Sequence, residues 1–271
     1  MGRPKRGLGA IFLGPVGIGK TSMLFNAPKP AFFFNMLETG FADFEVLGQV
    51  PQGVFGMDIP DYNTLLQMLK QNSPATVILD SLTGFQQLLF NHIIQTVYGG
   101  DKKKFSAFSV GPRKDAPTYL PELFGVLESL LKKGTHVFIT CHRAVDSIED
   151  PLNPDHVSYI LNLDKGIRER WEAWAPNILM FDQAVNITSA TKSAKNEAII
   201  EGKALNEDKR LMYTTASPGH PAKNKIGLPS YIILGRSPQE AWNNFWQHVP
   251  PAFKETPDEQ PTTAAPTQPG S

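Results

Sequence analysis

A glycine-rich stretch near the start of the chain limits its fold more than any other feature. The stretch consists of Gly14, Pro15, Val16, Gly17, Ile18, Gly19, Lys20 and Thr21. It satisfies the pattern G-x-x-x-x-G-K-[ST] at every fixed position. A short apolar run at 10–13 precedes it, and a helical pattern starting at Ser22 follows it. This strand, loop and helix order is the context in which such a loop wraps a phosphate chain, so we predict that the chain binds a nucleoside triphosphate.

Each part of this phosphate loop has an expected role. The glycines let the backbone curve closely, so that successive amides point toward the phosphates. Lys20 is expected to reach the β- and γ-phosphates, and the hydroxyl of Thr21 is expected to bind Mg²⁺. Ser22 completes the predicted nucleotide-binding set at the start of the helix. A chance glycine-rich turn is the alternative, and the flanking strand and helix make it the weaker interpretation.

Two carboxylates follow predicted strands further along the chain. Asp80 ends the apolar run 76–80, and Glu38 follows the apolar run 31–34. Ligands of parallel α/β sheets lie at the carboxyl ends of the strands, so we expect Asp80 to face the phosphate loop and to hold Mg²⁺ together with Thr21. Glu38 is the candidate catalytic base. Taken in isolation, either acid could be an ordinary turn or loop residue.

Composition narrows the classes of partner and compartment. The chain has 26 Lys and Arg against 26 Asp and Glu, so any binding to nucleic acid would depend on local basic patches. The single cysteine, Cys141, excludes an internal disulfide and a cysteine-based zinc site. We find no apolar run of about 18 residues and no signal-peptide pattern. We therefore expect a soluble, cytoplasmic protein with no membrane partner.

The patterning predicts one α/β domain between two short tails. We expect a short basic N-terminal tail over 1–7, a core over 8–249 and a disordered, Pro-rich C-terminal tail over 250–271. Apolar strands alternate with helical stripes through most of the core, which predicts a central, mostly parallel sheet flanked by helices. Beyond residue 181 the apolar period changes to that of short strands, which predicts a β-rich C-terminal part.

Two segments, 99–118 and 144–176, are predicted to be long irregular loops. Loops of this length in a compact domain are usually functional or disordered. The first segment carries basic and aromatic residues suited to tracking phosphates and stacking unpaired bases. They are Lys102, Lys103, Lys104, Phe105, Phe108, Arg113 and Lys114. A solvated charged loop with two core-facing phenylalanines is the alternative. In the second segment acidic residues offset the basic ones, so its basic residues alone predict little about DNA binding.

The order of these features resembles that of RecA-type recombinases and ring helicases. The likeness depends on the phosphate loop, Glu38 after the next strand, Asp80 followed by Ser81, and the polar residue His142 after a further strand. In AAA+ ATPases a catalytic Glu normally follows the metal-binding Asp directly, where this chain has Ser81. More closely, the chain resembles the phage-encoded, RecA-like ATPases of the single-strand annealing (Sak-type) family. The segment 222–229 is similar to the Lys-Asn-Arg-x-Gly-Leu-Pro segment of that family.

The resemblance implies roles for individual residues. Glu38 would activate the attacking water, and His142 would sense the γ-phosphate and couple it to a DNA-binding loop. Lys223 and Lys225 would neutralise charge at the site of a neighbouring subunit, although Lys225 stands where the family usually has Arg. The two predicted loops would line a DNA path. Alternatively, His142 could be a packed histidine at a strand end, and Lys223 and Lys225 could belong to an ordinary solvated basic turn.

The resemblance also implies a function. The chain would be a RecA-like P-loop NTPase with ATP and Mg²⁺ as cofactors, stimulated by single-stranded DNA and assembled into a ring or filament. With a single-strand binding protein it would support phage DNA recombination or annealing in the host cytoplasm. A nucleotide or small-molecule kinase, with the long segments as lids, stays open as an alternative. So does a nucleotide-dependent structural switch without DNA binding, since phosphate-loop domains host all three functions.

Overall fold

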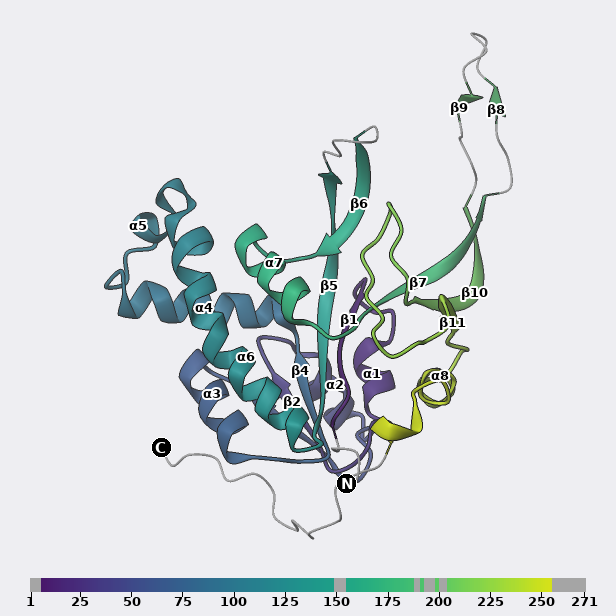
Figure 1. Ribbon diagram of the computed structural model, residues 1–271, viewed down its shortest axis with the longest axis horizontal. Coiled ribbons are helices and arrows are strands. Elements are labelled where there is room, and N and C mark those ends of the chain that lie inside the picture. Colours follow the sequence, from purple (N-terminus) through teal and green to yellow (C-terminus); the bar gives the residue numbers. More distant parts are fainter. Residues whose placement is uncertain (1–5, 149–154, 188–190, 193–197, 200–203, 255–271) are drawn as a thin grey trace.

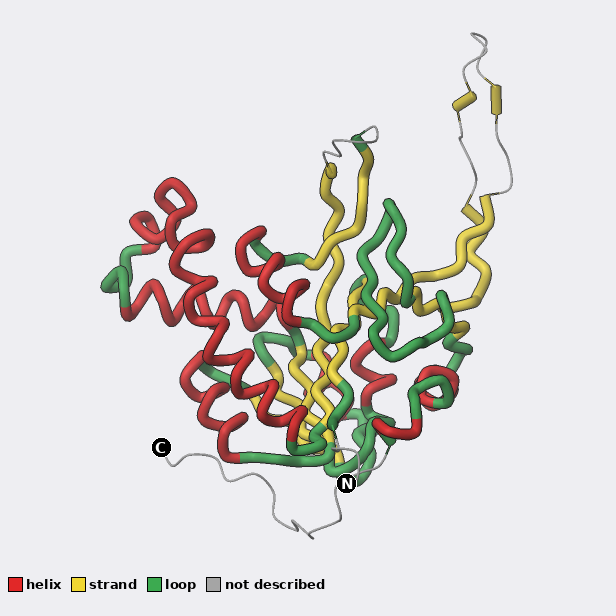
Figure 2. Tube along the Cα trace, viewed as in Figure 1, coloured by secondary structure: helices red, strands yellow, loops and turns green. Residues whose placement is uncertain are grey.

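The parallel strands at the centre of the molecule have helices on both sides (Figures 1 and 2). The computed structural model describes residues 6–148, 155–187, 191–192, 198–199 and 204–254. Its strands are β1 (Gly9–Gly14), β2 (Ala31–Asn35), β3 (Val54–Asp58), β4 (Thr76–Asp80), β5 (His136–Ile148), β6 (His156–Leu161), β7 (Ile178–Ile187), β8 (Thr191–Lys192), β9 (Ala198–Ile199), β10 (Ala204–Tyr213) and β11 (Tyr231–Ile233). Its α-helices are α1 (Lys20–Leu24), α2 (Gly40–Val46), α3 (Tyr62–Gln71), α4 (Leu82–Thr96), α5 (Lys102–Ser106), α6 (Ala116–Lys132), α7 (Lys165–Trp174) and α8 (Pro238–Trp246). Short helical turns are η1 (Ala107–Ser109), η2 (Gly111–Asp115) and η3 (Pro251–Phe253).

One nine-stranded sheet organises the described residues. Its order is β11-β10-β7-β1-β5-β4-β2-β3, and β6 pairs with the outer part of β5. Strands β3, β2, β4, β5, β1 and β7 pair in parallel, whereas β10 and β11 are antiparallel and form one edge. The predicted fold class is therefore confirmed: an α/β P-loop NTPase fold with a mostly parallel central sheet, flanking helices and a β-rich C-terminal part.

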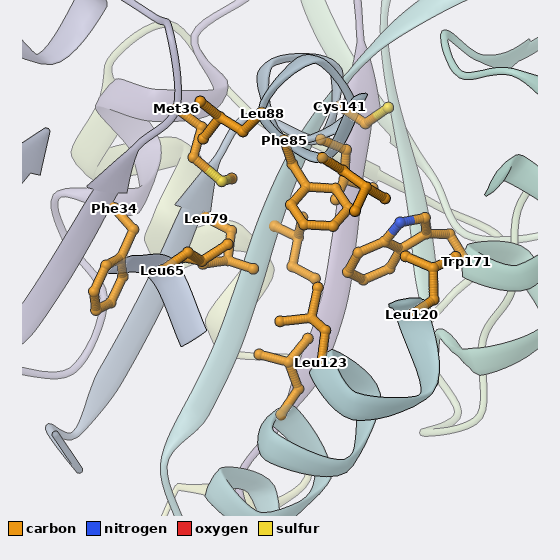
Figure 3. Packing of buried hydrophobic residues seen from close by; sticks show 14 of the residues in the cluster. Phe34, Met36, Leu65, Leu79, Phe85, Leu88, Leu120, Leu123, Cys141 and Trp171 are labelled. Atoms are coloured by element: carbon orange, nitrogen blue, oxygen red, sulfur yellow. The ribbon is translucent and has the colours of Figure 1, made fainter. Parts of the chain in front are cut away.

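The sheet has a hydrophobic cluster on each face, as expected for parallel strands covered by helices on both sides. Alternate residues of β1 divide between the clusters: Ile11 and Leu13 belong to one, Ala10 and Phe12 to the other. Helices α3, α4, α6 and α7 contribute to the first cluster, and α1, α2 and α8 to the second. Figure 3 shows the first cluster through residues such as Leu79, Phe85, Leu120 and Trp171.

The prediction of an irregular loop over 99–118 was wrong. These residues form α5, η1, η2 and the start of α6. The carboxylate of Asp101 accepts hydrogen bonds from the amides of Lys103 and Lys104, which caps α5 at its N-terminus. Phe105 then anchors this short helix in the core. Exposed lysines around one buried residue produce too weak an apolar period for the helix to be recognised from the sequence.

The prediction of an irregular loop over 144–176 was also wrong for the described residues, and 149–154 lie outside them. Strand β5 continues to Ile148 and pairs with β6 as an antiparallel hairpin, which projects beyond the helices in Figure 1. Helix α7 follows, and it buries Ile167 and Trp171 one helical turn apart.

The ends of the core extend past the predicted boundaries. At the N-terminal end, Arg6 forms an ion pair with Glu128, with 2.8 Å between Nη1 and Oε1. At the C-terminal end, η3 lies beyond the predicted boundary at residue 249, and Phe253 packs against the second cluster. The remaining parts of the predicted tails, 1–5 and 255–271, lie outside the described residues. No helix among the described residues is both long and apolar enough for a membrane crossing.

Candidate functional site

The parallel register brings the ends of β1, β2 and β4 to the same edge of the sheet as His142 in the middle of β5. Gly14 at the end of β1 pairs with His142 of β5. Asn35 at the end of β2 pairs with Asp80 at the end of β4. Glu38 lies three residues beyond the end of β2, and the phosphate loop begins at Gly14. Residues predicted separately from four strands therefore meet at the carboxyl edge, where ligands of such sheets bind.

The phosphate loop has the backbone conformation that its glycines permit. Gly17 and Gly19 have φ angles of 77° and 97°, values that residues with a Cβ rarely adopt. Helix α1 starts directly after Gly19, at Lys20. Ile18 is buried, whereas Val16 is exposed. The predicted nucleotide-binding residues Gly14 to Ser22 thus form one continuous turn from β1 into α1.

Lys20 folds back over this loop. Its Nζ donates hydrogen bonds to the carbonyl oxygens of Gly14, at 3.0 Å, and Pro15, at 2.8 Å. Burial lowers the pKa of Lys20 to about 8, because the charged ammonium loses water contacts. Nearby acidic groups, Asp80 first among them, partly offset this effect. The protonation of Lys20 should therefore depend on whether a charged group is bound in the phosphate loop.

Thr21 and Asp80 form the pair predicted to bind the metal. The hydroxyl of Thr21 donates to Oδ2 of Asp80 at 2.9 Å, and the hydroxyl of Thr140 donates to Oδ1. Burial raises the pKa of Asp80, so its carboxylate is costly to keep charged without a cation. A hydroxyl and a carboxylate side by side fit Mg²⁺, which prefers oxygen ligands and keeps several waters. The described part of the chain holds no cluster of three or more His, Cys, Asp or Glu residues suited to a metal.

Glu38 is held in place by two side chains from neighbouring strand ends. Its Oε1 accepts a hydrogen bond from Ser81 Oγ at 2.6 Å and lies 3.0 Å from His142 Nε2. The hydrogen bond from His142 is the largest cause of the lowered pKa of Glu38, although burial acts against it. Because Glu38 is ionised and only accepts, His142 carries its proton on Nε2. Leu37, just before Glu38, has a φ of 59° and an exposed side chain.

Ser81 and Thr140 also belong to the site, although neither was among the predicted site residues. Both supply hydroxyl groups that orient a site carboxylate: Ser81 binds Glu38, and Thr140 binds Asp80. A signal for them does exist, because Ser81 directly follows the apolar run 76–80, and Thr140 ends the apolar part of the strand that pairs with β1. Polar residues at such strand ends were the feature that identified Asp80, and the same rule applies to these two.

Lys223 and Lys225 lie away from the phosphate loop of their own chain. The amide of Lys225 donates to Asn177, whose side chain donates to the carbonyl of Gly9 at the opposite end of β1 from Gly14. The two ends are five residue steps apart along the strand, about 16 Å. Nζ of Lys223 donates to the carbonyls of Glu172 and Ala173 at the end of α7, at 3.0 and 3.2 Å. Lys223 is therefore engaged within the chain, which argues against its predicted role in a neighbouring site, whereas Lys225 is exposed.

The predicted DNA-binding residues separate into two groups. Exposed side chains on α5, η1 and η2 belong to Lys102, Lys103, Lys104, Phe108, Arg113 and Lys114. Phe108 is 100% exposed and has a φ of 51°. Phe105 is only 4% exposed and packs edge to face on Phe90 and Tyr98, with ring centroids 5.1 and 5.6 Å away. The expectation that Phe105 stacks on a base was therefore wrong, because its ring is part of the core.

Comparison with known proteins identifies a sequence family. Residues 6–226 match a family described as an AAA domain. No curated protein matches the chain. The chain is similar to flagellar accessory protein FlaH from Methanocaldococcus jannaschii, at 8% identity over 85% of both chains, with a TM-score of 0.44. It is also similar to the P4 protein from bacteriophage phi6 in complex with ADP, at 12% identity over 73% of this chain and 59% of that one, with a TM-score of 0.29.

Proposed function

This chain belongs to the AAA domain family of P-loop ATPases, and we propose that it binds ATP with Mg²⁺ and hydrolyses the γ-phosphate. The family match also limits an earlier distinction. Ser81 after Asp80 was taken to separate the chain from AAA+ ATPases, yet it does not place the chain outside the AAA family. The mechanism is therefore inferred from how the site residues are arranged, above all from the position of Glu38.

The observation that carries the proposal is the fixed position of Glu38 between Ser81 and His142, next to the pair formed by Thr21 and Asp80. In phosphoryl transfer the protein contributes mainly positioning and charge stabilisation. A carboxylate with a lowered pKa stays ionised, so Glu38 is suited to accept a hydrogen bond from the attacking water and orient it.

The remaining residues would share the work of holding the triphosphate. The amides of the phosphate loop and the ammonium of Lys20 would bind its oxygens. Thr21 and Asp80 would hold Mg²⁺, which when bound neutralises charge on the β- and γ-phosphate oxygens. Water would attack the γ-phosphorus, the bond from that phosphorus to the bridging oxygen would break, and ADP, inorganic phosphate and a proton would leave.

We also propose that α5, η1 and η2 bind single-stranded DNA. The lysines of α5 are exposed, and the exposed Phe108 follows them in the chain after a few residues, before exposed Arg113 and Lys114. A fully exposed aromatic ring in a left-handed backbone conformation costs free energy, and such cost is often found at functional positions. Cationic side chains beside a free ring suit a strand of unpaired bases. Helix α4 leads from Ser81 to this region over 15 residues, about 22 Å.

Self-association into a ring or filament is the third part of the proposal. Arg143 is the cation that follows His142 directly, and its Nη1 is 2.7 Å from Oδ2 of Asp182. Arg143 is thus paired, and Arg210, the other arginine at the phosphate loop, donates to the carbonyl of Ile18. We propose that a further cation reaches the triphosphate from a neighbouring subunit, with exposed Lys225 as the candidate. Phage recombination or annealing, with a single-strand binding protein as partner, is the role that such an assembly would serve.

The test is ATP hydrolysis at low salt with single-stranded DNA, with double-stranded DNA and without DNA, using Lys20→Ala as the blank. We expect single strands to raise the Lys20-dependent rate and added salt to remove the effect, because phosphate contacts release counterions. A rate that ignores DNA would refute the DNA part and favour a nucleotide switch. Phosphate transferred to a small acceptor, with no free phosphate released, would favour a kinase.

DNA binding itself has a matched pair of variants. Lys102→Ala with Lys103→Ala removes two exposed charges from α5, and Lys132→Ala with Lys133→Ala removes two exposed charges at the end of α6. Only the first pair should weaken binding to a fluorescent oligonucleotide in anisotropy titrations. The slope of log affinity against log salt should also become shallower by about 1.4, since each of two lost phosphate contacts on a single strand contributes about 0.7. Equal effects of both pairs would contradict the assignment.

A further inference from the structure

Arg210 on β10 connects the phosphate loop to the C-terminal part of the chain through three backbone carbonyls. Its Nη1 donates to the carbonyl oxygen of Ile18 at 3.2 Å. Its Nε donates to that of Gly235 at 3.1 Å, and its Nη2 donates to that of Ser237 at 3.2 Å. The rigid fork of a guanidinium is suited to fix several acceptors at once. These contacts hold together segments that are 192 residues apart in the sequence.

The contact with Ile18 determines which way a phosphate-loop amide points. The peptide unit between Ile18 and Gly19 is planar and trans, so its carbonyl and its N–H point in opposite directions. A guanidinium on the outer side of the loop, bound to the carbonyl, therefore directs the N–H of Gly19 toward the inner side. The guanidinium also lies against Gly19 itself: a Cβ on this residue would be 2.5 Å from Nη1 of Arg210.

The other end of the connection is firmly anchored. Ser237 precedes α8, and its Oγ accepts from the amide of Glu240 at 3.1 Å, while Glu240 Oε2 accepts from the amide of Arg236 at 2.8 Å. This reciprocal pattern closely resembles a capping box, which fixes the start of a helix. Helix α8 in turn packs on β1, since the ring centroids of Phe245 and Phe12 are 5.7 Å apart. The carbonyls of Gly235 and Ser237 thus lie next to a helix that is packed on the core, although Ser237 itself is exposed.

We propose that Arg210 is a positioning residue for the phosphate groups of the nucleotide. It holds the peptide between Ile18 and Gly19 so that the amide of Gly19 faces the phosphates, and it makes nucleotide affinity depend on β10 and α8. The inference rests on the proposed function, because it concerns the same phosphate loop. It assigns part of the phosphate affinity to a residue outside the phosphate-loop motif.

The experiment compares three single variants by titration calorimetry with ADP and, separately, with inorganic pyrophosphate. Arg210→Gln removes both the fork and its charge, Arg210→Lys keeps the charge without the fork, and Arg236→Gln is a matched control at an exposed arginine. We expect Arg210→Gln to weaken both ligands by about tenfold, as for a lost charge-assisted hydrogen bond. Arg210→Lys should lose almost as much, because a point charge cannot hold the peptide orientation, and Arg236→Gln should bind like the wild type.

Steady-state ATP hydrolysis adds a readout that a merely structural role would not produce. Arg210→Gln should raise KM more than it lowers kcat, since the loss concerns phosphate binding and leaves Glu38 in place. Thermal unfolding checks that each variant is folded. If Arg210→Gln does not fold, the affinities of Arg210→Lys test the proposal in its place.

The outcomes separate the inference from the function on which it rests. A wild-type protein that binds neither ligand would refute the proposed function itself. A wild-type protein that binds both, together with folded Arg210 variants of unchanged affinity, would overturn the inference alone. An effect on ADP without an effect on pyrophosphate would also overturn it, because Arg210 would then act on the nucleoside.

Discussion

The charge state of Lys20 makes nucleotide binding sensitive to alkaline pH. Burial lowers the pKa of Lys20 in the unliganded protein to about 8, well below its ordinary value of 10.5. The ammonium lies against the carbonyls of Gly14 and Pro15, where the phosphates of a nucleotide would approach it. Phosphate favours the charged form, so binding should raise the pKa of Lys20 again. Affinity should therefore fall as the pH rises through the unliganded pKa.

The size of the effect follows from that pKa. At pH 7 about nine-tenths of the unliganded protein carries a charged Lys20, and at pH 9 only about one-tenth does. Affinity for ADP should fall by about tenfold between these values. The lowered pKa of Lys20 affects the stability of the unliganded protein in the opposite direction to ADP affinity. Between pH 8 and 10.5 the unfolded chain binds more protons at Lys20 than the folded chain does. The contribution of Lys20 to the stability of the unliganded protein should thus rise with pH in that window.

Calorimetric titration with ADP at pH 7, 8 and 9, in buffers of different ionisation enthalpy, measures both affinity and proton uptake. We expect proton uptake close to zero at pH 7 and close to one per ADP at pH 9. Lys20→Arg is the control, because a guanidinium stays charged throughout and its profile should be flat. A wild-type affinity that stays constant from pH 7 to 9, without proton uptake, would refute this reasoning.

Three further predictions concern the acids of the site and a buried histidine. Glu38→Gln should slow phosphate release by about 10² to 10⁴ and leave ADP affinity nearly unchanged, because Glu38 acts on the attacking water; an equal loss of ADP affinity in calorimetry would contradict that role. Asp80→Asn should melt at a higher temperature than the wild type without ligand, because it removes a buried carboxylate whose pKa is raised by burial, and Mg²⁺ should no longer strengthen its nucleotide binding; a lower melting temperature would count against this. Burial lowers the pKa of His136 to about 4. As the pH falls from about 6.5 to 4, the unfolded state therefore binds a proton at this residue that the folded state does not. The free energy of unfolding of the wild type should fall by about 3 kcal/mol over this range. His136→Asn keeps an acceptor for the amide of Leu8, and in urea unfolding it should lose distinctly less over this range; parallel curves for both proteins would show that another group titrates.

Much of the fold and of the nucleotide site could be predicted because the relevant signals are local. The phosphate loop depends on residue types at fixed spacing, and Asp80 could be identified because it ends an apolar strand. The side-by-side arrangement of Glu38 and His142 could not be derived from their positions alone, since 104 residues separate them. That contact depends on β4 lying between β5 and β2, a strand order that apolar periodicity does not contain.

The failures have a common physical cause, which is tertiary contact. Phe105 and Phe108 look equivalent in the sequence, three residues apart in a basic segment. Only the packing of Phe105 against Phe90 and Tyr98 of the preceding segment distinguishes them. Lys223 likewise looks like a free basic residue in the sequence, and only its hydrogen bonds to the carbonyls at the end of α7 show that it is engaged. Such partners are distant or ambiguous in sequence, so no local pattern reports them.

The most direct test of the central claim is the release of inorganic phosphate from ATP by the purified protein, measured with and without Mg²⁺. Lys20→Ala serves as the blank, because it removes the ammonium from the phosphate loop without touching Glu38. We predict a wild-type rate that requires Mg²⁺ and is absent in Lys20→Ala. A wild-type rate no greater than that of Lys20→Ala, from protein shown to be folded, would contradict the assignment of this site as an ATPase centre.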